Sequence, residues 1–348
     1  MLSSYYYNQL NYAEKSAYST LRTAIMNRSR DCEVSLSGTD ALKVWRAVVM
    51  ENPEFIWYPG IWEDPRATAN STRFSFEYLK RTDDISQKGI NEEIFNTRLD
   101  ELVARIDSSL SRTATDYDVC KAIYDLLCTE IKYDYSVLNE YNRLRNENSA
   151  DLIRFAQEEM SAFTAYGTLI NKLGVCQGIS KLFNMLCDRF GIECVCIEAK
   201  MNDQNQSPHM LNAVEIDGQR AFVDVTNGLA VMHGEHPMVR YEYFAVSHST
   251  ISKRFTVEGD FGCDSDELSY YVRNNLVFYR TNDFIKFLAA YTSPKNAGEI
   301  RCLVHSGAVD DCRLRRMADE IIELHRPHGY VHTISVHDGY VTAYLRRT

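Results

Sequence analysis

The chain has 348 residues, is 45% hydrophobic and carries a formal net charge of −10. This length is typical of about two to three domains, and the apolar content is enough for a sizeable core. The acidic balance and the absence of a long basic stretch argue against nucleic acid, or an anionic membrane surface, as the main partner. No segment approaches the roughly 18 apolar residues that a membrane span requires.

The first ten residues lack the basic region and apolar run of a signal peptide. The ten cysteines are scattered, mostly within apolar patterns. Such usage favours reduced, buried thiols over a disulfide framework. We therefore expect a cytoplasmic protein.

The N-terminal residues, 1–85, predict a small α+β domain. Apolar residues at helical spacing predict two helices, and alternating residues predict two strands. The helices are expected over 9–27 and from Thr39 or Asp40 onward, and the strands over 31–35 and 73–79. The polar stretch 61–71 is expected to be a turn-rich connection.

The middle of the chain, 86–260, predicts a larger α+β domain. Helices are expected over 91–111, from Asp116 or Asp118 to 131, and over 176–191, with strands over 194–197, 209–217 and 220–226. Residues 136–158 are polar and charged. They are expected to form a solvated loop or helix face, with a substrate-facing lid as the alternative.

The last part of the chain, 261–348, predicts a second small α+β domain. The expected order is strand, helix, strand, helix and a final hairpin, over 276–280, 282–290, 300–305, 309–325, 330–336 and 340–346. The turn of the final hairpin is expected at 337–339, where an Asp-Gly pair lies.

One cysteine lies in a turn of small residues that opens directly into a helix. The sequence Leu173-Gly174-Val175-Cys176-Gln177-Gly178 precedes apolar residues at helical spacing. Cys176 is therefore expected at the positive end of a helix, where the dipole and free backbone N–H groups favour the thiolate. This position suits a nucleophile.

A histidine and an aspartate follow in the two strands of a predicted hairpin. His209 would open the first strand, Asp224 would lie near the end of the second, and Asp217-Gly218 is a strong tight-turn signal. In an antiparallel pair these positions share one end of the hairpin, so we expect the two side chains to meet. A cysteine with a histidine oriented by an acid is the arrangement that nucleophilic acyl transfer requires.

Each of these residues also has a structural interpretation. Cys176 could be a buried cysteine, His209 a surface residue at a strand edge, and Asp224 a turn residue. Cys187, Cys194 and Cys196 with His233 and His236 lack the paired spacing of structural zinc sites, so no metal site is expected. His325, His328, His332 and His337 are expected at the surface. The sequence leaves open whether Asn212 bonds near the site or only packs.

These blocks resemble the transglutaminase-like superfamily of papain-like cysteine enzymes, over about residues 116–250. The matching residues are Gly174–Gly178, Phe190-Gly191-Ile192, His209 to Asn212 with Val214, Val223–Thr226, and Tyr133-Asp134-Tyr135 as in bacterial members. The resemblance implies a papain-like α+β core, in which a helix carrying the cysteine packs on an antiparallel sheet carrying the histidine and aspartate. It also implies a bacterial origin.

The resemblance implies a catalytic triad of Cys176, His209 and Asp224. The thiolate attacks an amide carbonyl of a peptide or protein, and His209 protonates the leaving amine. The oxyanion would lie against the Cys176 backbone N–H. Ile170 stands where papain has a glutamine, so the second oxyanion donor is sought in Gln177 or Tyr166. Leu211 stands where the family often has an aromatic residue before the asparagine. The resemblance therefore does not imply that a substrate stacks at this position.

The sequence is compatible with three functions. Hydrolysis of the thioester by a cysteine peptidase or amidohydrolase is favoured, because nothing marks an amine-acceptor site or the calcium loops of animal transglutaminases. A protein-glutamine transamidase or deamidase is the second function, and a catalytically idle binding or scaffold protein is the third. No cofactor is expected, and the sequence does not indicate an oligomeric state.

Overall fold

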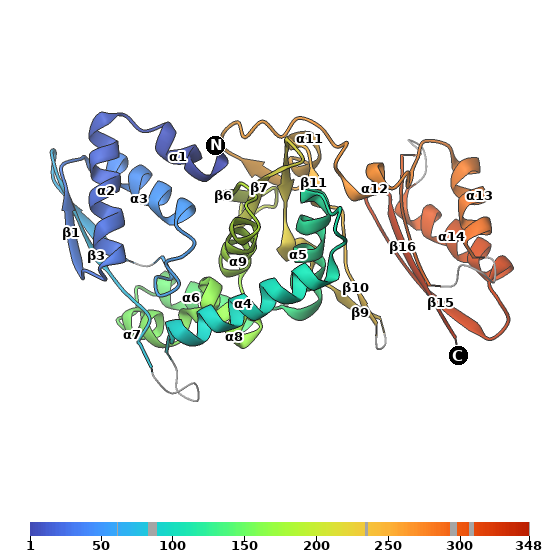
Figure 1. The fold of residues 1–348 in the computed structure, drawn as a ribbon, viewed down its shortest axis with the longest axis horizontal. Coiled ribbons are helices and arrows are strands. Elements are labelled where there is room, and N and C mark those ends of the chain that lie inside the picture. The colour runs from blue at the N-terminus through green and yellow to red at the C-terminus, as the bar shows by residue number, and fades with distance from the viewer. Residues whose placement is uncertain (61, 83–88, 234–235, 293–297, 306–309, 348) are drawn as a thin grey trace. The chain divides into compact units, whose positions relative to one another are not determined.

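The computed structural model describes residues 1–60, 62–82, 89–233, 236–292, 298–305 and 310–347. The chain divides into two compact units (Figure 1). The first contains Met1–Val231 and Pro237–Ser265, and the second contains Met232–His236 and Asp266–Thr348. No helix in these described ranges has both the length and the apolar character needed to cross a membrane.

Near the N-terminus, helices share a core with a three-stranded antiparallel sheet of order β1-β3-β2. The elements are η1 (Leu2–Ser4), α1 (Tyr5–Asn8), α2 (Tyr12–Met26), β1 (Asp31–Val34), α3 (Gly38–Glu51), β2 (Trp62–Ala67) and β3 (Thr72–Phe76). The two predicted helices and two predicted strands are confirmed. The prediction that 61–71 is only a connection is wrong for 62–67, which form β2; residue 61 lies outside the described part.

The core of these N-terminal elements continues into the rest of the first unit. Trp45, Tyr58 and Phe74 are buried in it together with Cys196 and Met210, and partly buried Cys176 packs against the same cluster. The N-terminal elements therefore support the strands and the helix that follow.

Two predicted helices in the next segment are confirmed. They are α4 (Glu92–Ser109) and α5 (Asp116–Glu130). The Asn91 side chain caps α4 by accepting the Ile94 N–H, and Thr115 with Asp118 forms a reciprocal capping box at α5. These local signals explain why the sequence placed both starts correctly.

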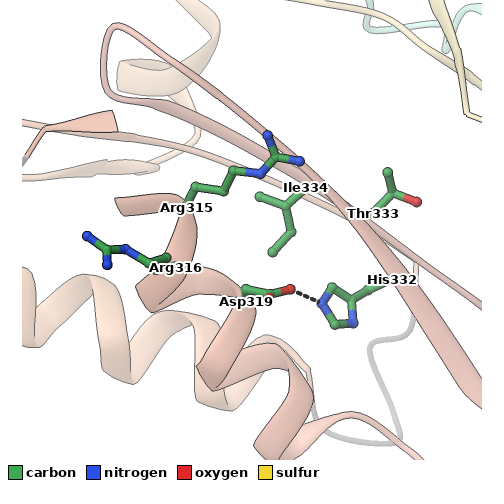
Figure 2. Close-up of a pocket in the computed structure, with 6 residues that line it drawn as sticks. All are labelled: Arg315, Arg316, Asp319, His332, Thr333 and Ile334. Carbon is green, nitrogen blue, oxygen red and sulfur yellow. Dashed lines mark hydrogen bonds and ion pairs between the residues drawn. The ribbon is translucent and has the colours of Figure 1, made fainter. Parts of the chain in front are cut away.

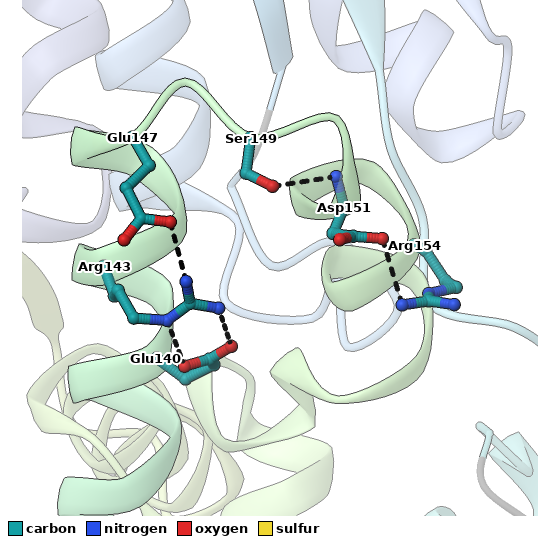
Figure 3. A network of polar contacts seen from close by, with 6 residues as sticks. All are labelled: Glu140, Arg143, Glu147, Ser149, Asp151 and Arg154. Carbon is teal, nitrogen blue, oxygen red and sulfur yellow. Dashed lines mark hydrogen bonds and ion pairs between the residues drawn. The ribbon is translucent and has the colours of Figure 1, made fainter.

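The charged stretch 136–158 forms two helices rather than a loop. They are α6 (Tyr135–Asn146) and α7 (Asp151–Glu158). Figure 3 shows their outer polar contacts, where Arg143 pairs with Glu140 and Glu147, all exposed. The opposite side of these helices packs against the protein interior. There Leu138 and Tyr141 contact a buried cluster that contains Val175. The solvated-face prediction is therefore confirmed for the outer side.

A short connection leads to the cysteine helix. It consists of η2 (Met160–Phe163), α8 (Ala165–Asn171) and β5 (Leu173–Gly174), which pairs in parallel with β4 (Lys132–Tyr133). Helix α9 (Cys176–Arg189) follows, as predicted. It packs on strands β6 and β7, where the Ser180 hydroxyl donates to Met210 O over 3.0 Å.

The central sheet has five strands in the order β11-β8-β7-β6-β12, and its paired neighbours are all antiparallel. Its elements are β6 (Cys194–Met201), β7 (Pro208–Ile216), β8 (Gln219–Val223), β11 (Phe244–Val246) and β12 (Phe255–Val257), with the short helices α10 (Val225–Gly228) and α11 (His248–Ile251). Strands β9 (Val231–His233) and β10 (His236–Met238) form a separate pair. The predicted fold class, a cysteine helix on an antiparallel sheet within an α+β chain, is confirmed.

The second unit contains a four-stranded sheet of order β13-β14-β16-β15, with a core shared by its two longer helices. Its elements are α12 (Tyr270–Arg273), β13 (Val277–Phe278), α13 (Thr281–Tyr291), β14 (Glu299–Val304), α14 (Asp311–His325), β15 (Tyr330–His337) and β16 (Tyr340–Arg347). The predicted order of strands and helices is confirmed. Gly339, at the hairpin turn, has a positive φ of 80°, as its Asp-Gly pair predicted.

Candidate active site

Helix α9 begins at Cys176 because the preceding chain is extended and closely packed. Val175 is the N-cap residue, and its N–H donates to Ala162 O over 3.0 Å. Gly178, in the first turn, leaves no room for a side chain, since an added Cβ would lie 2.3 Å from that same carbonyl oxygen. The Cys176 thiol therefore lies at the positive end of the helix.

His209 lies near the start of β7 with its ring buried. The ring stacks on Phe255, with centroids 4.7 Å apart and planes 11° apart. Its Nε2 lies 2.9 Å from Oδ2 of Asp224. An ionised carboxylate only accepts hydrogen bonds, so Nε2–H is the donor. Nδ1 is then the nitrogen left for the Cys176 thiol, with which the imidazole also interacts.

Asp224 directly follows β8 and is fully buried as the N-cap residue of α10. Its Oδ1 accepts the Asn227 backbone N–H over 3.1 Å, and its Oδ2 accepts the Asn227 side-chain amide over 2.6 Å. With His209, three donors hold the carboxylate. The predicted meeting of His209 and Asp224 at one end of the hairpin is thereby confirmed.

The three side chains shift one another's protonation. Burial raises the pKa of the Cys176 thiol, but hydrogen bonding to His209, the imidazole charge and the Met210 backbone bring it below its ordinary value. Burial lowers the pKa of His209, yet the Asp224 charge and hydrogen bond, followed by Cys176, raise it to about 10. Burial also opposes ionisation of Asp224, but His209 and Asn227 lower its pKa. This environment favours a thiolate–imidazolium pair beside a carboxylate.

The two residues considered for the second oxyanion donor have other hydrogen-bond partners. The Gln177 Nε2 donates to Pro59 O and to Phe163 O, both over 3.0 Å. The buried Tyr166 hydroxyl accepts the Asn91 N–H over 3.2 Å. Both amide hydrogens of Gln177 are thus engaged, and its side chain ties the start of α9 to the N-terminal elements.

Asn212 bonds near the site as well as packing. It is fully buried on β7, and its Nδ2 donates to Ser180 O over 3.1 Å and approaches Cys194 Sγ at 3.5 Å. Its Oδ1 has no hydrogen-bond partner within the described residues. Asn212 therefore joins α9 to the central sheet on the strand that carries His209.

Sequence reasoning missed two residues that contact His209 and Asp224. Phe255, which stacks on His209, comes from β12 at the far edge of the sheet order, and no local pattern linked it to β7. Asn227 had a readable signal, because an aspartate that ends a strand commonly accepts the N–H three residues later as a helix cap. That signal would have predicted a fixed orientation for Asp224.

The ten cysteines are free thiols. Cys176 is partly buried and Cys312 is exposed, whereas the other eight are buried. Cys187 is fully buried beside Cys120 and Cys194, where burial raises the pKa of its thiol well above the ordinary value. The Cys176 thiol lies beside His209, whose hydrogen bond and charge lower its pKa.

Among the described residues, a set with the spacing of metal ligands lies in the second unit. Asp311, His337 and Asp338 are the one set with metal-like spacing within the described ranges, but the Asp311 carboxylate already accepts the Asp338 and Gly339 N–H groups. The Asp311 carboxylate therefore holds the turn of the hairpin formed by β15 and β16.

A hollow of about 310 Å³ lies between α14 and β15 of the second unit (Figure 2). It is lined by Arg315, Arg316, Asp319, His332, Thr333 and Ile334. The surface position predicted for His332 is confirmed only in part, because the residue is half-buried and its side chain is 9% exposed. Its Nε2 lies 2.7 Å from Asp319 Oδ1.

Comparison with known proteins gives distant structural likenesses. No family model and no curated protein matches the chain. A solved structure described as a TGase is 13% identical over 51% of this chain and 46% of its own, with a TM-score of 0.31. A proposed cysteine protease from Cytophaga hutchinsonii is 14% identical over 46% of this chain and 55% of its own, with a TM-score of 0.26.

A proposed protease from Parabacteroides distasonis is 10% identical over 47% of this chain and 36% of its own, with a TM-score of 0.24. The chain thus spans about a third to about half of the length of these structures.

Proposed function

We propose that the chain is a cysteine-dependent acyl-transfer enzyme acting on an amide bond of a peptide or protein. The observation that carries the proposal is the buried contact of 2.9 Å between His209 Nε2 and Asp224 Oδ2, with Cys176 at the start of α9 interacting with the same imidazole. A buried imidazole bonded to a buried carboxylate on one side and a thiol on the other is the geometry of an activated nucleophile.

In the proposed reaction the Cys176 thiolate attacks the amide carbonyl carbon. The carbonyl π electrons move to oxygen, which accepts a hydrogen bond from the Cys176 backbone N–H. Collapse of this intermediate breaks the C–N bond, and the His209 imidazolium gives its proton to the leaving amine. Asp224 holds the ring so that Nδ1 faces the sulfur, and it stabilises the imidazolium.

Neutral His209 then takes a proton from water, whose oxygen attacks the thioester and releases the acid and the thiol. An amine in place of water would give transamidation. The two outcomes separate when a glutamine-containing protein is incubated with a dansylated primary amine. Covalent dansyl incorporation indicates transamidation, whereas new N-termini or ammonia release without incorporation indicates hydrolysis.

The proposed thiolate predicts selective alkylation of Cys176. At pH 6.5 a thiol of ordinary pKa near 8.5 is only about 1% thiolate. Because the pKa of Cys176 is lowered, we expect iodoacetamide to modify it at least about tenfold faster than the more exposed Cys312. Quenched time points analysed by peptide mass spectrometry would give both rates in one sample.

The same experiment with His209→Ala tests the role of the imidazole. Removing the positive charge leaves burial to raise the thiol pKa, so the rate at pH 6.5 should fall about tenfold or more and its pH midpoint should rise. His325→Ala, at an exposed histidine, serves as the control and should match wild type. Slow alkylation of Cys176 that is indifferent to His209 would instead favour the idle scaffold.

A further inference from the structure

Ser180 joins the cysteine helix to the strand that carries His209. It lies one turn after Cys176 on α9 and is buried. Its hydroxyl donates to Met210 O over 3.0 Å, and its own carbonyl accepts the Asn212 side-chain amide over 3.1 Å. A single residue of α9 therefore makes two hydrogen bonds to β7, one in each direction.

Helix formation does not explain a serine at this position. Alanine has the higher helix propensity, and a serine inside a helix commonly bonds the carbonyl four residues earlier, here that of Cys176. The Ser180 hydroxyl is instead directed out of the helix toward Met210. The side chain at position 180 therefore serves the contact between α9 and β7.

The Met210 carbonyl is available to α9 because of its place in the sheet. Met201 N–H donates to Ser207 O over 2.9 Å, so the odd-numbered residues from Ser207 onward form the hydrogen-bonded pairs of the β6–β7 ladder. Met210 therefore turns its N–H and C=O away from β6. On that other side, β8 pairs with β7 only from Asn212 onward. The Ser180 hydroxyl thus supplies the partner that a strand would otherwise give.

The two bonds fix how far α9 is shifted along β7. Four residues of an α-helix rise about 6 Å, and two residues of a strand rise about 6.8 Å. Ser180 is held opposite residues 210 and 212, whose midpoint lies two residues beyond His209. Cys176, four residues before Ser180, is therefore level with His209.

A further contact, one turn later on α9, has the matching alignment. Asn184 Nδ2 approaches Cys196 Sγ at 3.8 Å, and Cys196 pairs with Asn212 across β6 and β7. As α9 advances from Ser180 to Asn184, its contacts therefore move from Met210 and Asn212 to the row of Asn212. The helix and the strand thus run in the same direction, as the level position of the nucleophile requires.

We propose that Ser180 is a positioning residue for the acyl transfer, and that its two hydrogen bonds to β7 hold the Cys176 sulfur level with the His209 imidazole. The inference rests on the proposed function. Without the hydroxyl, α9 is free to slide or turn against β7. A shift of about 1 Å can slow an enzymatic reaction about 10²-fold, because the reacting groups lose their alignment.

The test compares Ser180→Ala with Thr292→Val. Alanine removes the hydroxyl and favours the helix, so α9 should still form. Thr292 is fully buried in the second unit, where its hydroxyl donates to Leu288 O over 2.8 Å, so valine there removes a buried bond of the same kind. The probe is p-nitrophenyl acetate, with nitrophenolate release corrected by a Cys176→Ala blank. We expect acylation to fall about 10- to 10²-fold in Ser180→Ala and to keep its wild-type rate in Thr292→Val.

Alkylation of Cys176 by iodoacetamide against pH separates positioning from general support of the fold. In Ser180→Ala the midpoint pH should rise by at least about 0.5, because the sulfur moves relative to the imidazolium. The limiting rate at high pH should stay within about threefold of wild type, since the thiolate itself is unchanged. Asn212→Ala breaks the other bond of the same contact and should raise the midpoint in the same direction. Thermal unfolding followed by circular dichroism should show that the variants are folded.

Other outcomes overturn the inference. A midpoint at the wild-type value in Ser180→Ala and Asn212→Ala would show that the contact only stabilises the fold, and would leave the proposed function intact. An equal loss of acylation in Thr292→Val would show that the loss of any buried hydroxyl has this effect. If Ser180→Ala does not fold, Asn212→Ala decides between these outcomes. Failure of wild type to exceed the Cys176→Ala blank would refute the proposed function and this inference with it.

Discussion

Substitution of Asp224 by asparagine should slow acyl transfer by about two to four orders of magnitude. The aspartate Oδ2 accepts from both His209 and Asn227, and Oδ1 accepts the Asn227 N–H. An asparagine amide cannot accept at both positions. If its NH₂ group faces the imidazole, the ring proton moves to Nδ1, where it faces Cys176 and prevents the ring from acting as a base.

The lost negative charge acts in the same direction. The Asp224 carboxylate is the main factor that raises the pKa of buried His209 to about 10, so its neutralisation lowers that pKa. A neutral imidazole stabilises the thiolate less, and the apparent pKa of Cys176 should rise. Nitrophenyl ester acylation and iodoacetamide alkylation against pH would report the two effects separately.

Asp217→Asn is the matched control, since it makes the same chemical change at the other end of the hairpin. Asp217 lies in a tight turn at φ 50°, which asparagine tolerates as well as aspartate does. The control should keep wild-type acylation. Wild-type rates in Asp224→Asn would show that the buried pair is only structural, and the triad proposal would then fail.

The fold around the site was predictable where local signals were strong. Apolar residues at helical spacing after Cys176 predicted α9, and the Asp217-Gly218 turn predicted the hairpin that brings His209 to Asp224. Both signals lie within a few residues of the elements that they define. Strand β2 was missed because its sequence, Trp-Glu-Asp-Pro-Arg-Ala, is polar and contains a proline.

The surroundings of the site depend on contacts between distant segments, which no local pattern encodes. Gln177 bonds to Pro59, 118 residues away, through a backbone carbonyl that accepts from any suitable donor. Tyr133 lies beside Gly174 only because two strands of two residues each pair in parallel. Strands this short have no readable periodicity, so the sequence did not predict this neighbour of the cysteine turn.

The N-terminal elements are part of the support of the proposed site. Their core includes Cys196 and Met210 of the central sheet, and Cys176 packs against it. The Met210 backbone also helps to lower the pKa of the Cys176 thiol. A change in the N-terminal core is therefore expected to alter the reactivity of Cys176, although the triad lies on later segments.

The close approach that positions Cys176 predicts a large loss of stability for Gly178→Ala. An added Cβ would lie 2.3 Å from Ala162 O, 2.6 Å from Thr168 Oγ1 and 2.8 Å from Thr164 O. Two of these atoms are backbone oxygens, so relief requires α9 to move away from the connection formed by η2 and α8. We expect the free energy of unfolding to fall by about 2–4 kcal/mol, measured by urea denaturation.

The same displacement should lower the reactivity of Cys176, which lies only two residues before Gly178. Val175, the N-cap residue of α9, also donates its N–H to the Ala162 carbonyl. Gly38→Ala is the control, since its added Cβ would meet only the Ala67 Cβ, at 3.2 Å, and should change stability by less than about 1 kcal/mol. In Gly178→Ala the midpoint pH for alkylation of Cys176 should rise, because the sulfur moves relative to His209. Unchanged stability and an unchanged midpoint would show that α9 tolerates a side chain at this position, and that its packing against Ala162 does not fix the nucleophile.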